Sequence, residues 1–343
     1  MAPPDEYLIT IDREEWKAFR RFEVWRKEWW AFALRRYDWL HGIGRTVYRV
    51  SFDDRTAKPE FSVPQRLDQV LLGDVLSRFS HWAKSLSRGM RTLWRDADGH
   101  IVLADIFGIY RLTRTGAVER YLSIPDFSDL HCVLPGKDQE HLLVTSTGTE
   151  EILEVNWDGT IVERIRMNEV FRTGANTALK GALACTKDRR LLPLDHMRHV
   201  FHVNWAKWLQ DGMSMLISCH TPGLVAILRK DNAGKWSVVR QLGYFPHCHC
   251  PALDEVNNIV YVAVSRSDEI RAVDVASGET LWTVGDIRYG KAVEIVGSEH
   301  LVVGDCNGKR LVEINRMSGK VVRDCPLPGI PYGICRVAGN HES

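Results

Sequence analysis

Short apolar runs separated by turn residues fill most of the chain, from about residue 89 onward. Runs such as "HLLVTS" and "NIVYVAV" have the length and residue types of β-strands. A glycine turn recurs between runs, at Thr115-Gly116, Asp158-Gly159, Ala233-Gly234, Ser277-Gly278 and Ser318-Gly319. Most of these turns are about 42 residues apart, and one longer interval contains an insertion at residues 172–198. Repeats of this length with four short strands each predict an all-β protein, a β-propeller.

Counting the repeats predicts six blades. They begin near Gly89, Leu130, Phe201, Pro246, Tyr289 and Tyr332. The last of these contains a single strand, "YGICRV", so its partner strands must come from the N-terminal part of the chain. The segments "YLITID" and "TVYRVSF" are the candidates. Such a closure joins the two ends of the ring by hydrogen bonds and leaves no open sheet edge.

The N-terminal part has a different pattern. Aromatic residues recur at helical spacing from Trp16 to Ala33, Asp12 is placed to cap this helix, and Gly42 is placed to end it. Five of the 12 Trp residues fall in this segment. Basic and acidic residues are mixed along it, which gives only a weak attraction to lipid. We therefore expect the aromatic stripe to pack on the body of the protein or on a second copy, as a homo-oligomer contact.

A second helix is predicted near residues 67–86, where apolar residues again recur at helical spacing. Residues 1–88 are therefore expected to form a helical segment that contributes strands to ring closure. Residues 89–343 are expected to form the propeller. A chain of 343 residues with 45% hydrophobic residues is long enough for a large core.

Charge and cysteine content narrow the function classes. The chain has 45 basic and 44 acidic residues, and no basic stripe, so nucleic acid is not an expected partner. No apolar run reaches about 18 residues, and the first residues lack the pattern of a signal peptide, so we expect neither a transmembrane segment nor secretion. The eight scattered cysteines lie in or beside apolar runs, which favours reduced thiols in a cytoplasmic protein.

The entrances of the innermost strands carry the candidate chemistry. Counting back from the core of the second strand of each repeat predicts a ring of side chains around the channel: Arg91, His131, His202 with Asn204, His249, Lys291, and Tyr332 beside Gly333. His202 and Asn204 are two residues apart on one strand and therefore share a face. His220 is close enough in the sequence pattern to reach the same site. Histidine makes up 13 of 343 residues, so three histidines among six equivalent entrances indicate function.

This ring is rich in cations and hydrogen-bond donors and has no obvious carboxylate. It therefore favours a small anionic substrate or a developing negative charge. The three imidazoles of His131, His202 and His249 are also a possible ligand set for a transition metal, Fe, Mn, Cu or Zn. The stretch "PHCHC" adds His247, Cys248 and Cys250 as reserve ligands.

At these residues the sequence resembles the arylsulfate sulfotransferase-like propellers. That family has a His-x-Asn-Ser stretch followed by "DG…LLVSSRH", and here His202-Val203-Asn204-Trp205 is followed by Asp211-Gly212 and "MLISCH". The "H-D" entrances of the family look like His131 and His249. The repeat pattern is similar over roughly residues 89–337, and the motifs are specific around residues 131, 200–220 and 247–264.

The resemblance implies that His249 corresponds to a transiently sulfated nucleophile. It implies that His131, His202 and Asn204 bind the sulfuryl oxygens. From their places in the ring we expect Arg91, Lys291, Tyr332 and His220 to bind the substrate as well. The serine and the arginine of the family motifs are Trp205 and Cys219 here, so a bidentate sulfuryl binder is missing.

Three functions therefore remain open after the sequence is read. The first is an enzyme that acts on a small anionic or phenolic molecule at a metal-free histidine cluster. The second is a three-histidine metalloenzyme. The third is a binding or scaffold propeller without catalysis. The insertion at residues 172–198 follows the second repeat, close in sequence to His202, and suggests a cap over the channel.

Overall fold

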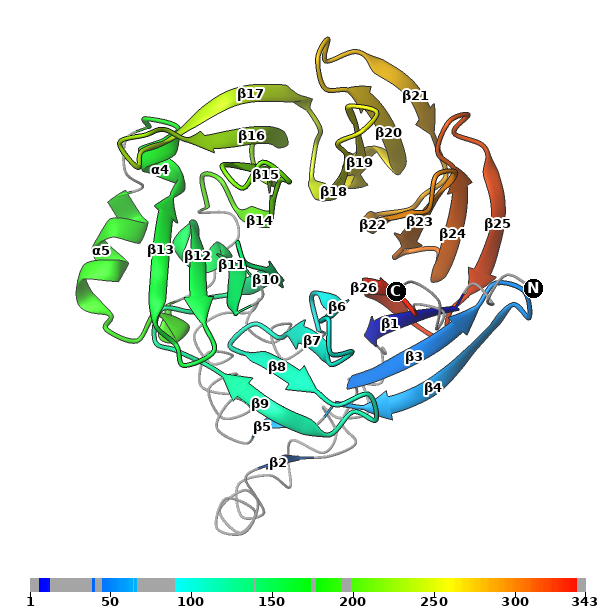
Figure 1. Ribbon diagram of the computed structural model, residues 1–343, viewed down its shortest axis with the longest axis horizontal. Coiled ribbons are helices and arrows are strands. Elements are labelled where there is room, and N and C mark those ends of the chain that lie inside the picture. The colour runs from blue at the N-terminus through cyan, green and yellow to red at the C-terminus, as the bar shows by residue number, and fades with distance from the viewer. Residues whose placement is uncertain are drawn as a thin grey trace.

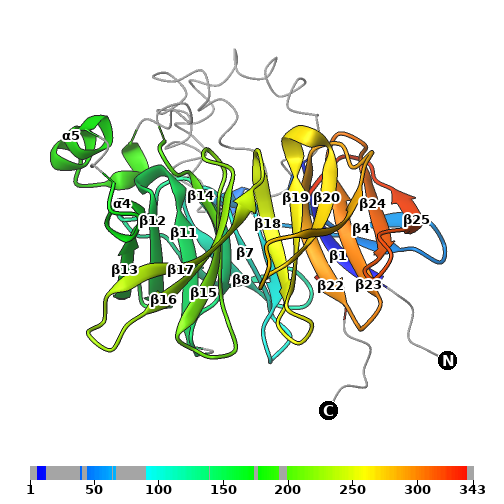
Figure 2. The same cartoon turned by 90° about the horizontal axis from the view of Figure 1, so that it is seen from above.

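The computed structural model describes residues 6–12, 39–40, 45–63, 65–66, 90–138, 140–173, 177–192 and 199–337. Six antiparallel sheets of four strands surround a common axis (Figure 1), and Figure 2 shows the same ring from the side. The prediction of an all-β, six-bladed propeller is confirmed. The two helices predicted in the N-terminal part fall mainly outside the described residues.

Blades 1 to 5 each consist of four consecutive strands, ordered from the axis outward. Blade 1 contains β6 (Leu93–Arg95), β7 (Ile101–Ala104), β8 (Ile109–Leu112) and β9 (Val118–Leu122). Blade 2 contains β10 (Leu130–Pro135), β11 (His141–Ser146), β12 (Glu151–Asn156) and β13 (Ile161–Arg166). Blade 3 contains β14 (Val203–Trp208), β15 (Ser214–Cys219), β16 (Leu224–Lys230) and β17 (Trp236–Tyr244).

The last two of these five blades follow the same plan. Blade 4 contains β18 (Cys248–Asp254), β19 (Ile259–Val264), β20 (Glu269–Asp274) and β21 (Thr280–Val284). Blade 5 contains β22 (Gly290–Val296), β23 (His300–Asp305), β24 (Arg310–Asn315) and β25 (Val321–Pro326). Single 3-10 turns, η3 (Thr147–Thr149) and η6 (Ser265–Ser267), join the second and third strands of blades 2 and 4.

Blade 6 combines both ends of the chain. Its innermost strand is β26 (Ile330–Arg336), followed outward by β1 (Glu6–Asp12), β3 (Arg45–Ser51) and β4 (Thr56–Ser62). Strand β1 pairs with β26 on one side and with β3 on the other. These are the segments "YLITID" and "TVYRVSF", so the strand pairing expected from the sequence is present.

The glycine turns that revealed the repeat link the third and fourth strands of blades 1 to 5. Each of these glycines has a positive φ, between 69° and 92°. Residues with a side chain rarely adopt this conformation, which explains why glycine recurs at this position.

The core lies between neighbouring blades. One cluster joins blades 5 and 6 through Ile9, Tyr48, Val302, Leu311 and Ile334, all of them buried. Similar clusters fill the other spaces between blades. Every inner strand is therefore held from both sides, which gives the channel a rigid wall.

The described part of the insertion lies at the outside of the ring. Helix α4 (Met167–Val170), helix α5 (Thr177–Cys185) and the 3-10 turn η4 (Arg189–Leu191) follow β13, and Figure 1 shows α5 at the periphery. Arg189 donates to Glu151 and Arg190 donates to Ser123, so ion pairs and hydrogen bonds hold this segment to blades 1 and 2. The expectation that the insertion covers the channel is wrong for these residues.

Two short strands correct the helix prediction locally. Trp39–Leu40 form β2, which pairs with β5 (Gln65–Arg66) rather than continuing a helix toward Gly42. Asp12 ends strand β1 and pairs with Ile330. Within the described residues, no helix has both the length and the apolar character needed to cross a membrane.

Candidate functional site

The entrances of four inner strands share an unusual backbone conformation. The residue immediately before β10, β14, β18 and β22 has a positive φ; these residues are Asp129, His202, His247 and Tyr289, at 48°, 49°, 56° and 56°. Residues with a side chain adopt this region rarely, and it occurs mostly where function or packing requires it. Two residues further along are His131, Asn204, His249 and Lys291.

Irregular pairing changes the direction of these side chains. The register between first and second strands shifts between Leu130 and Cys132, between Val203 and Trp205, between His249 and Ala252, and between Gly290 and Val293. Such bulges insert extra residues and turn side chains out of the regular alternation. This bulge occurs at the same place in blades 2 to 5, so it places one ring of side chains at one end of the channel, called the channel mouth below.

Four histidines form a continuous row at the channel mouth. Ring centroids are 4.8 Å apart for His131 and His202, and 5.1 Å apart for His202 and His220. His220 and His249 follow at 5.0 Å. The row crosses blades 2, 3 and 4, and it brings together the three predicted histidines and His220.

Two further histidines and one carboxylate flank this row. The Nδ1 atoms of His199 and His202 are 2.9 Å apart, so one of these nitrogens donates to the other. The ring of His247 stacks on His220 with centroids 4.4 Å apart. Asp129 is fully buried, and its Oδ2 lies 3.3 Å from Nε2 of His131. We call His131, His199, His202, His220, His247 and His249 the histidine cluster.

Cations and tyrosines complete the ring on the other three blades. Lys291 Nζ lies 3.9 Å from the ring centroid of Tyr332 and 5.4 Å from that of Tyr289. The guanidinium of Arg91 lies 5.5 Å from the ring centroid of Tyr332. Tyr289 also contacts His249, with centroids 5.6 Å apart. The predicted ring residues are therefore neighbours in space.

Hydrogen bonds fix the tautomer of His249. Its Nδ1 lies 2.8 Å from Oγ of Ser265, which itself donates to the carbonyl oxygen of Gly290. A serine hydroxyl has one proton, and the carbonyl can only accept, so the proton of Ser265 goes to Gly290. His249 Nδ1 must then carry a proton and donate it to Ser265. The lone pair of His249 is consequently on Nε2.

The electrostatic environment keeps His249 neutral and Lys291 charged. Burial, and then the positive charge of Lys291 and the neighbouring imidazoles, lower the pKa of His249 well below its ordinary value. Burial also lowers the pKa of Lys291, but attraction by Tyr332 and the thiol of Cys306 outweighs it and leaves this pKa raised. A neutral imidazole therefore stands near a permanent cation.

The buried charge state of His249 predicts a pH dependence of stability. The folded-state pKa lies below the unfolded value of about 6.5, so the unfolded chain binds more protons as the pH falls through 6.5 toward the folded pKa. The free energy of unfolding should therefore fall in this window, by at most about 1.4 kcal/mol per pH unit from this one group. Urea unfolding at several pH values measures this slope. We expect His249→Gln to flatten this slope.

Asn204 has a different environment from the one expected of an oxyanion binder. It is buried, its Nδ2 donates to the carbonyl of Cys248 at 2.9 Å, and its Oδ1 accepts from Ser218 at 2.6 Å. These bonds tie β14 to β15 and to β18 of the next blade. In this arrangement the amide links blades 3 and 4 and holds the histidines on either side in place.

The cysteines of the C-x-C stretch do not form one ligand pair. Cys248 is buried in the core between blades, where its Sγ contacts the carbonyl of Cys219 at 3.6 Å. Cys250 instead lines the channel. Burial raises the pKa of both thiols to about 12, so neither is a thiolate near neutral pH. The seven cysteines described as free include both of them.

The described side chains do not form a three-histidine metal centre. Among them, only Asp96, Asp98 and His100 place three or more potential ligand atoms within 4.8 Å of one another. Arg111 occupies this group, because its guanidinium contacts Asp96 at 2.8 Å, Asp98 at 3.1 Å and Nδ1 of His100 at 2.8 Å. The positive charge of Arg111 therefore already balances these carboxylates.

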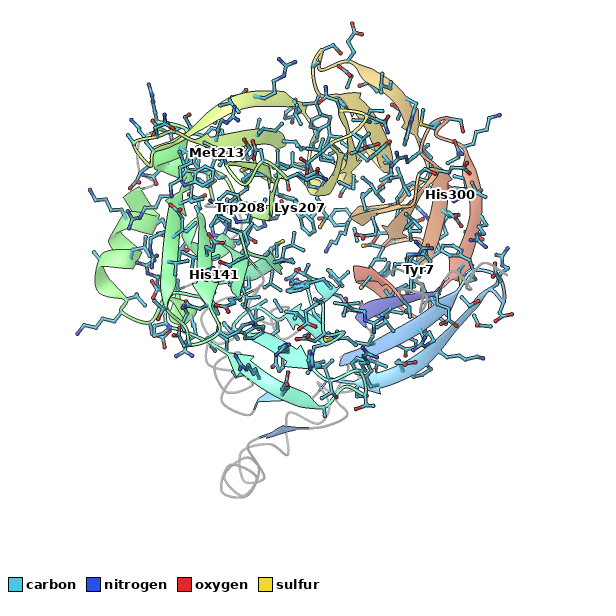
Figure 3. The ribbon with its side chains drawn as sticks, viewed as in Figure 1. Tyr7, His141, Lys207, Trp208, Met213 and His300 are labelled. Carbon is cyan, nitrogen blue, oxygen red and sulfur yellow. The ribbon has the colours of Figure 1, made fainter. Side chains whose placement is uncertain are left out.

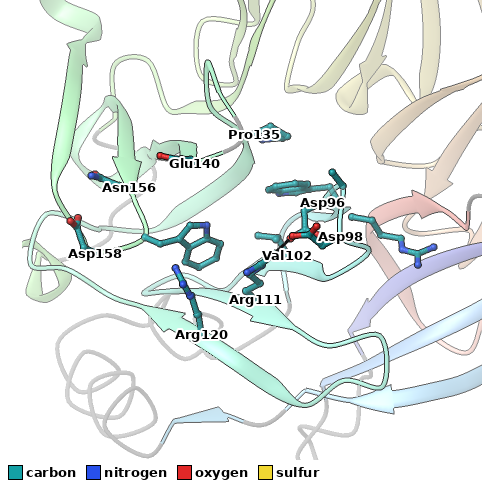
Figure 4. A pocket seen from close by; sticks show the side chains of 13 residues that line it. Asp96, Asp98, Val102, Arg111, Arg120, Pro135, Glu140, Asn156 and Asp158 are labelled. Carbon is teal, nitrogen blue, oxygen red and sulfur yellow. Dashed lines mark hydrogen bonds and ion pairs between the residues drawn. The ribbon is translucent and has the colours of Figure 1, made fainter. Parts of the chain in front are cut away.

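This acidic group lies at the edge of a pocket between blades 1 and 2, with a volume of about 600 Å³ (Figure 4). Trp94, Trp157 and Arg120 line other parts of it. The pocket lies beside the turns that follow β6 and β12, away from the channel mouth, and it shares no residue with the histidine cluster. It therefore adds nothing to the chemistry of the channel mouth.

Several residues of the site were not identified from the sequence as parts of the ring. They are Asp129, His199, Ser265 and Tyr289. Asp129 and Tyr289 stand two residues before His131 and Lys291, so extending the repeat frame by two positions would have found them. Ser265 lies in a turn and His199 outside the repeat, and the sequence contains no signal for either.

Comparison with known proteins gives the fold and no activity. No protein-family model matches the chain, and no curated protein sequence matches it. A protein of unknown function from Bacteroides caccae is similar over 98% of this chain and 100% of its own, with a TM-score of 0.56 and 12% identity. A chain of a nidogen–laminin complex is similar over 97% of this chain and 98% of its own, with a TM-score of 0.58 and 11% identity.

A provisionally assigned 6-phosphogluconolactonase from Bacteroides fragilis is also similar in structure. The similarity covers 98% of this chain and 99% of that one, with a TM-score of 0.54 and 10% identity. Identities this low show a shared fold only, because unrelated functions occur on the same propeller scaffold. The chain is thus a six-bladed β-propeller with a histidine cluster at one end of its channel.

Proposed function

We propose that the chain is an enzyme that acts on a small anionic or phenolic substrate at the channel mouth, with His249 as nucleophile or general base. The observation that carries this proposal is the hydrogen-bond chain from His249 to Ser265 to Gly290. It leaves the lone pair on Nε2 of an imidazole that burial keeps neutral. A neutral, oriented imidazole is what nucleophilic and general-base catalysis both require.

The neighbouring cations support an anionic substrate. Lys291 is charged, and within the described ranges its contacts are the faces of Tyr289 and Tyr332, which carry no charge to neutralise it. Arg91 likewise lies over Tyr332. Cations in a partly dry site stabilise negative charge on a transferred group or a leaving group. The ring geometry therefore favours an anion close to His249.

Sulfuryl transfer is the reaction that best combines these features. In the first step, Nε2 of His249 forms a bond to the sulfur of an aryl sulfate, and the S–O bond to the aryl group breaks. The electron pair of that bond leaves with the phenolate. In the second step, the oxygen of an acceptor phenol attacks the sulfur, the N–S bond breaks and its electron pair returns to Nε2. The acceptor proton passes to a neighbouring imidazole or to solvent.

The test is incubation of the protein with an aryl sulfate, with and without an acceptor phenol. We expect phenol release that accelerates when acceptor is added, and a sulfuryl adduct on the peptide containing His249 when acceptor is omitted. Mass spectrometry under neutral or mildly alkaline conditions detects the adduct. Turnover of anionic esters without any adduct would assign His249 as a general base instead. A lack of turnover on sulfate, phosphate and carboxylate aryl esters would reject the proposal.

A further inference from the structure

A cavity of about 360 Å³ lies within the channel, below the channel mouth. All six blades contribute to its wall. The lining residues are Arg91 to Arg95 from blade 1, Leu134 to Gly136 from blade 2, Trp205, Lys207 and Trp208 from blade 3, Cys250 from blade 4, Ala292 to Glu294 from blade 5, and Tyr332 to Cys335 from blade 6. Most of these residues follow the ring residues along their strands. The volume is within the range of small-molecule sites.

Several residues of the cavity wall carry buried hydrogen-bond donors that have no partner. Within the described ranges, five buried N–H groups on its lining residues have no acceptor: Nε of Arg91 and Arg95, and Nε1 of Trp94, Trp205 and Trp208. A buried donor without a partner costs about 1–3 kcal/mol, and most buried donors in folded proteins are paired. These five atoms are closed off from the cavity in this structure, and rotation of their side chains would bring them to the acceptors of a ligand.

The charged residues Arg95, Lys207 and Glu294 of the cavity wall favour a monoanion as ligand. Lys207 on β14 and Glu294 on β22 interact electrostatically across it, and Figure 3 shows Lys207 beside Trp208 at the edge of the central opening. Arg95 on β6 lines the same space and has no ion pair among the described residues. Once Glu294 is set against Lys207, the cation of Arg95 is left for a ligand; Arg91 also lines the wall, over the ring of Tyr332.

Glu294 lines the cavity, so its side chain is exposed to the channel while the inner strands surround it on the other sides. This environment raises its pKa to about 7, an effect that Lys207 partly opposes. Besides Lys207, the other charged or titratable residues that line the cavity are Arg91, Arg95, Cys250, Tyr332 and Cys335. The raised pKa increases the fraction of Glu294 that is protonated near neutral pH. Protonation removes the one acidic group in the wall and favours an anion.

We propose that this cavity is a binding site for an aromatic monocarboxylate, separate from the histidine cluster. The indoles of Trp94, Trp205 and Trp208 supply flat apolar walls for the ring of the ligand, and aromatic pairs of this kind add to the affinity. Arg95 and the indole N–H groups bind the carboxylate. This inference does not rest on the proposed catalytic function: it uses none of the histidines, although Arg91 and Tyr332 line the cavity and also belong to the ring at the channel mouth.

The test uses naphthoate as the probe and isothermal titration calorimetry of the full chain. We expect one naphthoate per chain, and binding at least tenfold weaker for the uncharged analogue naphthamide. The affinity should fall about tenfold between about pH 6 and about pH 8, because Glu294 becomes ionised. Arg95→Gln should weaken binding about tenfold or more, and Glu294→Gln should remove the pH dependence.

Controls separate this inference from the catalytic proposal and from misfolding. His249→Ala should bind naphthoate as the wild type does, even if it loses all activity. Arg120→Gln removes an arginine outside the cavity and should have no effect on binding. Equal thermal unfolding temperatures for Arg95→Gln and wild type establish that the variant is folded. No naphthoate binding by the wild type, or equal binding by a folded Arg95→Gln variant, would overturn the inference.

Discussion

Replacing His249 with alanine is expected to lower turnover of the substrate by about a thousandfold while the protein remains folded. The substitution removes an imidazole whose Nδ1 proton is bonded to Ser265, and with it the lone pair on Nε2. The ring cations are unchanged, so substrate binding should persist. Steady-state kinetics with the best aryl ester of the screen measures this: kcat should fall and KM should change little.

Two further variants make this result specific. His141→Ala removes a histidine that pairs with Asp138 at 2.8 Å, and Figure 3 shows it away from the central opening. It should retain full activity. Ser265→Ala removes the acceptor for Nδ1, so both tautomers become accessible, and we expect a loss of about tenfold with an altered pH profile. Full activity of His249→Ala would remove His249 from the mechanism.

The second large effect concerns the closure of the ring. Ile9→Ala is expected to lower the free energy of unfolding by about 2–5 kcal/mol. Ile9 is fully buried in β1, where it is paired with Ile334 of β26 and with Tyr48 of β3. The smaller side chain leaves a cavity in the blade that joins the two ends of the chain.

Urea unfolding followed by circular dichroism measures this change. Val321→Ala is the matched control, because Val321 also lies in a strand but is 51% exposed. A surface change of this type usually stays within about 0.5 kcal/mol. Equal losses for the two variants would show that the closing blade contributes no more to stability than the outer surface of the ring.

The repeat made the fold predictable from the sequence. Each glycine turn requires a positive φ, so the turns stand out in the sequence and mark the blades. The pairing of β1 with β26 was expected because a ring with a single strand in its last blade must take partners from elsewhere. The strands Trp39–Leu40 and Gln65–Arg66 were missed, since two residues carry no periodic pattern.

The candidate site was predictable only in part. The repeat frame placed Arg91, His131, His249 and Lys291 at equivalent positions, and the structure brings them to one end of the channel. Strict alternation of side chains along a strand does not predict the bulges, because a bulge depends on how neighbouring strands pair. The Asn204 amide hydrogen-bonds to Ser218 and to the carbonyl of Cys248 in the next blade. No sequence pattern indicates this contact between blades.

The shared sixth blade also determines when the protein can become complete during its synthesis. Thr10 and Gly333, which hydrogen-bond across this blade, are separated by 323 positions in the sequence. Strand β1 leaves the ribosome long before its inner partner β26 is made. Until then β1 presents a free edge, which invites pairing with other chains. A chain that stops before Ile330 can never cover that edge, so premature termination in the last repeat should yield aggregates rather than a five-bladed protein.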